Sequence, residues 1–309
     1  MWTAGCCIAV AGLVAAVYWP TTRYGFTNYD DPDYVTANRA LRQPGLRGLW
    51  AVVSRPMPAS HGDYLPVTMV SYWLDYRWWQ LEAGGYHLSN LAVHAASAGL
   101  ICWLLLRLGG ALWVAVVAGL LFGLHPMNTE AVSWVSERKS VLSMFWLLLS
   151  MHSFITWRGR AGLGWYVAAV VLYLLACLSK TAVVFYPLLL LGERIYLRRW
   201  RLRRAVVWTV PFAVVAGLCA AGRLIGHAYS GQLGWRPFGG LAEQAINVVG
   251  FFGMYLAKLC WPAGLNCSYP LRVLESVFSG WVLLGGAALV VLVVVAVRAY
   301  GRWPLVGFL

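Results

Sequence analysis

The chain has 309 residues, of which 61% are hydrophobic and 11% are charged, and its formal net charge is +13. A soluble domain carries about 25% charged residues, so this composition excludes an ordinary soluble globular protein. Many of the arginines lie at the ends of apolar runs, where basic residues set the orientation of membrane helices, and this excludes a nucleic-acid-binding role for the positive charge. The sequence therefore predicts an integral, multi-pass membrane protein.

Apolar runs along the chain predict eight membrane-spanning helices, because a bilayer core of about 30 Å needs about 20 apolar residues per helix. The predicted spans are residues 5–19, 88–106, 111–124, 141–157, 165–178, 182–196, 205–221 and 282–297. A ninth run, residues 245–261, contains Lys258 and ends at Trp261 before a proline. We interpret it as an interfacial or re-entrant helix. The predicted fold is an all-α transmembrane bundle, a single membrane domain over residues 1–309.

Arginines mark the turns that we expect to face the cytoplasm. Arg107 and Arg158 follow predicted spans, and six more arginines lie between residues 194 and 204. By the positive-inside rule, the long loop at about residues 20–86 and the turns at 125–139 and 179–181 then face outward. We expect a location in the bacterial inner membrane, with the functional chemistry on the periplasmic side. The last residues resemble the opening of another span, so we also expect that the chain is truncated at its C-terminus and lacks further helices.

The acidic residues are concentrated in the predicted outer segments. Asp30 and Asp31 follow the first helix closely, and a positioned carboxylate can accept a proton from a hydroxyl nucleophile. Asn, Asp and Pro are also turn formers, so a catalytic pair and a simple turn both fit this stretch. No carboxylate lies near the centre of a predicted span, which argues against a proton-coupled transporter, because such proteins carry charges at membrane depth.

The three lysines, Lys139, Lys180 and Lys258, fall at the predicted outer ends of helices, and Arg138 adjoins the first of them. Cations at the outer membrane plane can bind the phosphate of a lipid substrate. They can also snorkel to the lipid headgroups. Both interpretations remain open at this stage.

Two histidine-containing stretches carry polar groups near the predicted outer surface. His87 and Asn90 share one helical face, where they either line a cavity or bond to a neighbouring helix. His125 opens a helix start in which Asn128 or Thr129 can cap the helix and Glu130 favours the positive end of the helix dipole. Capping accounts for these residues but not for His125.

The seven cysteines lack metal-ligand spacing and are interpreted as small buried residues. Cys260 and Cys267 can pair only if both face an oxidising compartment. No metal site is predicted. A bound divalent cation is compatible with the chemistry, but no ligand set is clear. The nucleotide-binding and hydrolase motifs of soluble enzymes are missing.

Several stretches together resemble one family, the transmembrane and tetratricopeptide-repeat protein O-mannosyltransferases and their bacterial relatives, which have the C-type fold of polyprenyl-phosphate-sugar glycosyltransferases. The similar stretches are spread over most of the chain in the family's order. They are Tyr29-Asp-Asp, Tyr64-Leu-Pro-Val-Thr, Gly85-Tyr-His-Leu-Ser-Asn-Leu-Ala-Val-His94, His125-Pro-Met-Asn-Thr-Glu-Ala-Val-Ser-Trp-Val-Ser-Glu-Arg-Lys139, Leu178-Ser-Lys180 and Tyr255-Leu-Ala-Lys-Leu-Cys-Trp-Pro262.

The resemblance implies a membrane glycosyltransferase that moves a mannose-like sugar from a polyprenyl phosphate to a hydroxyl of a protein or glycan acceptor on the outer side. It implies that Asp30 or Asp31 is the base. It also implies that Arg138 and Lys180, with Lys139 beside them, bind the phosphate of the lipid-linked donor.

The resemblance further implies that His125 and Glu130 shape the site. The chain departs from the family in having Asn128 where relatives often have His and in having Ser140 where they often have Asp, and we expect it to lack the family's repeat domain. The alternative functions are a flippase or transporter for lipid-linked sugars and a non-catalytic membrane scaffold. The membrane lipid is a partner under all three.

Overall fold

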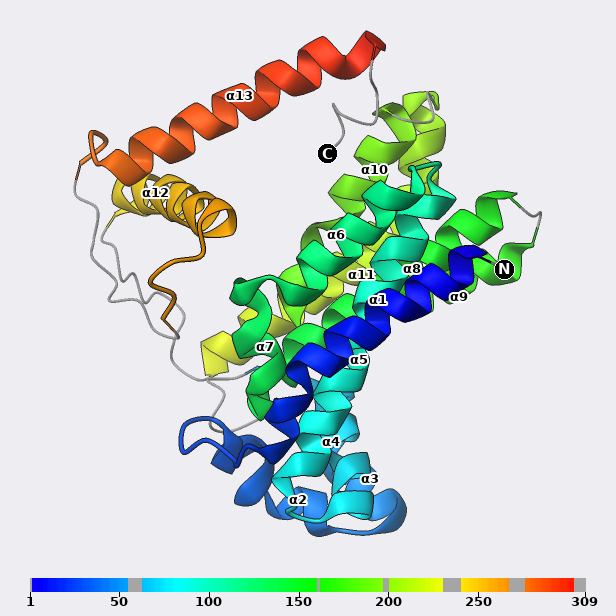
Figure 1. Cartoon of the computed structure of the whole chain (residues 1–309), viewed down its shortest axis with the longest axis vertical. Helices are drawn as coiled ribbons and strands as arrows, with labels where there is room; N and C mark the ends of the chain where they lie inside the picture. Colours follow the sequence, from blue (N-terminus) through cyan, green and yellow to red (C-terminus); the bar gives the residue numbers. More distant parts are fainter. Residues whose placement is uncertain are drawn as a thin grey trace. The chain divides into compact units, whose positions relative to one another are not determined.

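The computed structural model describes residues 2–54, 63–159, 162–196, 200–229, 240–266 and 276–302. Within these ranges every regular element is a helix, as Figure 1 shows, which confirms the predicted all-α class. The chain divides into two compact units, Met1–Tyr186 with Pro211–Leu233 and Pro187–Val210 with Gly234–Leu309. Each unit is described by itself below. The arginines at 160, 198 and 199, and Cys267, lie outside the described residues.

Long apolar helices form the first unit. They are α1 (Trp2–Tyr18), α5 (Ala83–Arg107), α6 (Leu112–Leu124), α8 (Arg138–Gly159) and α9 (Leu163–Ser179). Four helical stretches in the described residues are long and apolar enough to cross a membrane: Thr3–Arg23, Ala83–Arg107, Val135–Trp157 and Leu202–Tyr229. A fifth candidate is α6 with the bent segment Pro126–Ser133. These spans support a multi-pass integral membrane protein.

Small residues let the helices of the first unit approach closely. A Cβ added at Gly123 on α6 would lie 2.3 Å from a methyl group of Val14 on α1 and 3.0 Å from the Cβ of Ala98 on α5. Polar bonds join the same helices, since His94 Nε2 lies 2.9 Å from the Gly123 carbonyl oxygen. Close backbone approach and interhelical hydrogen bonds are the usual means of helix association in lipid.

The predicted outer loop of about residues 20–86 is largely helical. It contains η1 (Trp19–Arg23), η2 (Pro32–Thr36), α2 (Arg39–Arg42), α3 (Gly45–Val53) and α4 (Pro66–Trp79), and α5 begins within its predicted bounds. The segment has its own buried cluster, which includes Tyr34, Leu41, Met69 and Tyr72. This cluster gives the segment a fixed structure on which functional side chains can be held.

Short turns connect the spans near this segment. Between α6 and α8 the chain forms η3 (Pro126–Asn128), α7 (Thr129–Ser133) and η4 (Val135–Glu137), and η5 (Thr181–Phe185) follows α9. The end of α9 is tied to α4 because the Thr68 hydroxyl donates to the Ser179 carbonyl at 3.1 Å. The backbone of Lys180 therefore has a fixed place.

The remaining helices are α10 (Tyr186–Tyr196), α11 (Leu202–Tyr229), α12 (Leu241–Cys260) and α13 (Gly280–Arg302). The predicted span at 182–196 is wrong as a single helix, because it is divided between η5 and α10. The 11 residues of α10 reach only about 17 Å. In the second unit α12 packs on α13 where two glycines meet: a Cβ at Gly253 would lie 2.7 Å from the Gly285 nitrogen. The interfacial placement of residues 245–261 stays a prediction.

Candidate active site

Asp31 is fully buried and anchors the turn that precedes α8. Its Oδ2 accepts from the Thr27 amide at 2.7 Å and the Thr27 hydroxyl at 3.0 Å, and its Oδ1 accepts from the Ser136 amide at 3.0 Å and from the Ser136 hydroxyl. Tyr72 holds the same turn, because its hydroxyl donates to the Val135 carbonyl at 2.7 Å. Burial raises the pKa of Tyr72 well above its usual value of 10, so this hydroxyl stays a donor. With four donors bound, the Asp31 carboxylate has a structural role.

Asp30 differs from its neighbour in exposure and in partner. Its carboxylate keeps 34% of its side-chain surface exposed, and Oδ2 lies 3.7 Å from the ammonium of Lys139. The Asp30 carbonyl accepts from the backbone amides of Asp33 and Tyr34, which fixes the local backbone. Asp30 is therefore an oriented carboxylate that an incoming hydroxyl group can reach.

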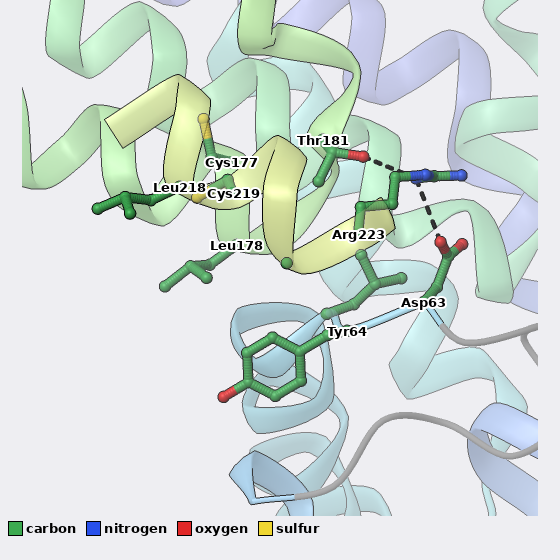
Figure 2. A pocket seen from close by; sticks show the side chains of 10 residues that line it. Asp63, Tyr64, Cys177, Leu178, Thr181, Leu218, Cys219 and Arg223 are labelled. Atoms are coloured by element: carbon green, nitrogen blue, oxygen red, sulfur yellow. Dashed lines mark hydrogen bonds and ion pairs between the residues drawn. The ribbon is translucent and has the colours of Figure 1, made fainter. Parts of the chain in front are cut away.

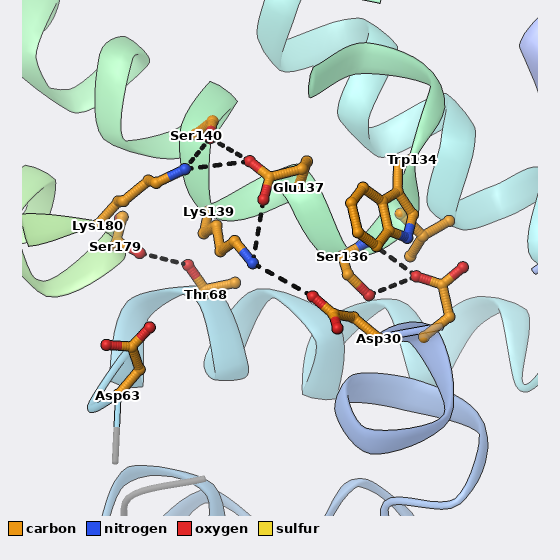
Figure 3. Close-up of polar contacts among 12 residues, drawn as sticks. Asp30, Asp63, Thr68, Trp134, Ser136, Glu137, Lys139, Ser140, Ser179 and Lys180 are labelled. Carbon is orange, nitrogen blue, oxygen red and sulfur yellow. Dashed lines mark hydrogen bonds and ion pairs between the residues drawn. The ribbon is translucent and has the colours of Figure 1, made fainter. Parts of the chain in front are cut away.

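Glu137 links the two lysines near Asp30. Its Oε1 lies 3.1 Å from the Lys139 ammonium and its Oε2 lies 3.1 Å from the Lys180 ammonium. The Ser140 hydroxyl donates to Glu137 Oε2 at 2.5 Å and accepts from Lys180 at 2.7 Å. Figure 3 shows these side chains in one connected row that ends at Asp30. Glu137 was not among the predicted site residues, although its place directly before Arg138 and Lys139 was a signal that could have found it.

Arg138, predicted to bind the donor phosphate, lies in the interior with 1% of its surface exposed. Its guanidinium donates to Asp75 at 2.5 Å, to the Asn90 side-chain oxygen at 2.6 Å and to the Tyr86 carbonyl at 2.7 Å. It also lies 4.6 Å from the ring centre of Tyr72. These three bonds are directed inward, so the contacts favour a structural role for Arg138 over the predicted binding of the donor phosphate.

The face of α5 that carries His87 and Asn90 is likewise turned toward protein. The Asn90 amide donates to the Trp134 carbonyl at 3.1 Å while its oxygen accepts from Arg138. His87 is buried, and its Nε2 lies 3.4 Å from the Gly25 carbonyl. Of the two interpretations left open by the sequence, bonding to neighbouring segments fits these contacts and lining a cavity does not.

The turn after α6 is capped differently from the prediction. The His125 side chain is the cap, because its Nδ1 accepts from the Met127 amide at 3.2 Å. Asn128 caps nothing and instead donates back to the Phe122 carbonyl at 2.7 Å. Glu130 is exposed in the first turn of α7. Asn128 is the N-cap residue of α7 but makes no side-chain capping bond there, so the expected capping by Asn128 is wrong.

An apolar cavity of about 210 Å³ lies between α9 and α11, and Thr181, which follows Lys180 in the chain, is part of its lining. Its lining includes Leu65, Leu178, Leu218 and Gly222. Figure 2 shows the charged residues at one side of it: Arg223 donates to the Thr181 hydroxyl at 2.6 Å and pairs with Asp63 at 3.2 Å. A cation beside an apolar cavity suits a ligand that carries both an anionic group and a hydrocarbon chain. In the described ranges no three His, Cys, Asp or Glu side chains come together as a metal site.

Comparison of the sequence with curated proteins finds relatives that match up to about half of the chain. The chain is 32% identical over 158 residues to Protein O-mannosyl-transferase TMTC3 of Homo sapiens, a match covering 48% of this chain and 17% of the relative. It is 40% identical over 92 residues to Protein O-mannosyl-transferase tmtc2 of Xenopus laevis, covering 30% and 11%. It is 32% identical over 182 residues to Protein O-mannosyl-transferase Tmtc3 of Drosophila melanogaster, covering 50% and 19%. The curated relatives of this chain are protein O-mannosyl-transferases of the TMTC family.

These comparisons confirm the resemblance read from the motifs. The matches cover less than a fifth of the length of these three relatives. No family model matches the chain. No solved structure matches it either. The names of the relatives support a glycosyltransferase role for this membrane protein.

Proposed function

We propose that this chain carries the active site of a membrane glycosyltransferase, which transfers a mannose-like sugar from a polyprenyl phosphate to a hydroxyl group of a protein acceptor. One observation carries the proposal: Asp30 and Lys180, a carboxylate and an ammonium, are the exposed ends of one row of charged side chains. The names of the relatives support the sugar and the acceptor. The outward orientation and the bacterial inner membrane remain predictions.

In the proposed reaction Asp30 accepts the proton of the acceptor hydroxyl. The hydroxyl oxygen then bonds to the anomeric carbon of the donor while the bond from that carbon to the phosphate oxygen breaks, and polyprenyl phosphate leaves. Lys180 faces the leaving phosphate, and Lys139 adds positive charge from the buried side. Fixed cations directed at developing negative charge stabilise such a transition state.

The apolar cavity supports a lipid-linked donor. Lys180 directly precedes Thr181, which lines the cavity together with Leu178 and Leu218. A phosphate held at Lys180 would therefore have an apolar space beside it for the first part of the polyprenyl chain. A water-soluble sugar nucleotide has no hydrocarbon chain that would contact this apolar lining.

The test is sugar transfer from radiolabelled polyprenyl-phosphate mannose in membranes that carry the full-length protein. We expect Asp30→Asn to abolish transfer while the purified variant unfolds at the wild-type temperature, because this carboxylate makes a single long contact. We expect Asp31→Asn to lower the unfolding temperature, because the buried Asp31 accepts four hydrogen bonds.

The transfer result decides among the functions. If Asp30→Asn transfers label as fast as wild type, the proposed mechanism is wrong. If wild type transfers no label but moves lipid-linked sugar across a bilayer, the chain is a flippase, and if it does neither it is a scaffold.

A further inference from the structure

The four charged side chains at the site alternate in sign and form a row. Asp30 lies 3.7 Å from Lys139, Lys139 lies 3.1 Å from Glu137, and Glu137 lies 3.1 Å from Lys180. The two outer members have 34% and 33% of their side-chain surface exposed, and the two inner members have 13% and 15%. Figure 3 shows the row running across the site, with its inner members between the two open ends.

Glu137 is the member that fixes the positions of the others. A lysine ammonium sits on a flexible four-carbon stem and has no defined place unless a partner holds it. Each oxygen of Glu137 holds one lysine, and Ser140 joins Glu137 Oε2 to Lys180 by two hydrogen bonds of 2.5 and 2.7 Å. Without the Glu137 charge, two neighbouring ammonium groups would repel each other and separate.

We propose that Glu137 is a positioning residue of the transfer reaction. It sets the distance between Asp30 and Lys180 by holding Lys180 directly and Asp30 through Lys139. The inference rests on the proposed function, since displacement at the anomeric carbon places the base and the leaving phosphate on opposite sides of that carbon. Small errors in such an arrangement cost a large part of the rate. Glu137 itself touches none of the reacting groups.

A change in the net charge of the row allows the positioning role of Glu137 to be distinguished from a role in folding by kinetics. The two carboxylates and two ammonium groups sum to zero before an anionic donor enters. Glu137→Gln leaves the row with a net charge of +1, which favours donor binding, while it loosens the two lysines, which slows the reaction. We therefore expect kcat to fall by roughly 10- to 100-fold and the KM for polyprenyl-phosphate mannose to stay constant or fall. Substitution of a residue needed only for folding would lower the amount of folded enzyme. The remaining folded molecules would have the wild-type kcat and the wild-type KM.

The experiment measures kcat and donor KM of the full-length protein per folded molecule, for wild type, Glu137→Gln, Ser140→Ala and Asp33→Asn. Ser140→Ala removes only the hydroxyl that joins Glu137 to Lys180, so we expect a smaller fall in kcat, and this variant decides the question if Glu137→Gln does not accumulate. Asp33 is an exposed carboxylate three residues after Asp30, and its variant should match wild type.

Each outcome has one meaning. A kcat of Glu137→Gln within twofold of wild type, or a raised donor KM at constant kcat, overturns the positioning role while the proposed function stands. If Glu137→Gln does not accumulate, wild-type kinetics in Ser140→Ala overturn it instead. If wild type transfers nothing, both the function and this role are overturned.

Discussion

Removing the charge of Asp75 should destabilise the protein strongly, because it leaves the buried Arg138 without its counter-ion. The side chains of this pair are 6% and 2% exposed, and their contact is 2.5 Å. Loss of one partner of a buried ion pair costs about 3–5 kcal/mol. Asp75→Asn keeps one oxygen that can accept from Arg138, so we expect the lower end, about 3 kcal/mol. At about 2–4 °C per kcal/mol, the unfolding temperature should fall by roughly 6–12 °C.

The assay is thermal unfolding of the full-length protein in detergent, followed by tryptophan fluorescence. Asp33→Asn, which removes an exposed carboxylate, is the matched control and should unfold at the wild-type temperature. An unfolding temperature of Asp75→Asn within about 2 °C of wild type, below the shift expected for 1 kcal/mol, would refute the account of Arg138 as a buried structural cation.

A double variant separates the cost of breaking the pair from the net contribution of the pair. Burial raises the pKa of the Asp75 carboxyl, and the adjacent Arg138 lowers it by less. Both side chains of the pair are buried, and the desolvation of two buried charges can equal their attraction, so we expect the intact pair to contribute little net stability. Replacing both partners by apolar residues, as in Asp75→Leu with Arg138→Met, should recover part of the stability lost in Asp75→Asn. A double variant less stable than Asp75→Asn would contradict this reasoning.

Two further predictions concern glycines. Gly222 lines the apolar cavity, and a Cβ there meets nothing within 4 Å. Gly222→Phe should therefore fill the cavity and raise the KM for long-chain donors several-fold, with no effect on the KM for a short-chain donor. Gly217→Phe, on the same helix and equally open, is the control, and equal effects of the two variants would exclude the cavity as the site of the lipid chain. In the second unit Gly253→Val should lower the unfolding temperature, because its Cβ would lie 2.7 Å from the Gly285 nitrogen. Gly286→Val, with open space around it, is the control and should leave the unfolding temperature unchanged. Equal unfolding temperatures of the two variants would contradict the close packing.

The helices could be predicted where apolar length decides the structure. The runs at 88–106 and 141–157 lie inside α5 and α8, because lipid leaves the backbone few alternatives to a helix. The run at 182–196 contains Pro187, Glu193 and Arg194, and it is divided after Phe185, between η5 and α10. The run is shorter than the about 20 residues that a span needs, and Pro187 lies in the first turn of α10, where proline is tolerated because the first amides of a helix have no partner within it.

The sequence predicts a region for the site but does not separate the roles of the residues in it. Asp30 and Asp31 are adjacent and chemically identical, and what distinguishes them includes the burial of Asp31 and its bonds to Ser136, 105 positions away. Arg138 looks like a phosphate ligand in the sequence, but its partner Asp75 lies 63 positions earlier. Such long-range pairings leave no local signal, because the neighbouring sequence looks the same for a charged residue that the fold buries and for one that stays exposed.

The stretch from Ser136 to Lys139 shows how one short segment serves both stability and chemistry. Ser136 and Arg138 are buried and bonded to fixed partners. Glu137 and Lys139, which alternate with them, bond to each other and belong to the row of charges at the site. The buried residues therefore hold the backbone from which the two inner charges of the row project. A fixed backbone is needed if the carboxylate and the ammonium at the ends of long, flexible side chains are to stay at a set distance while substrate enters between them. On this argument, changes at 136 and 138 act first on stability, whereas changes at 137 and 139 act first on the rate.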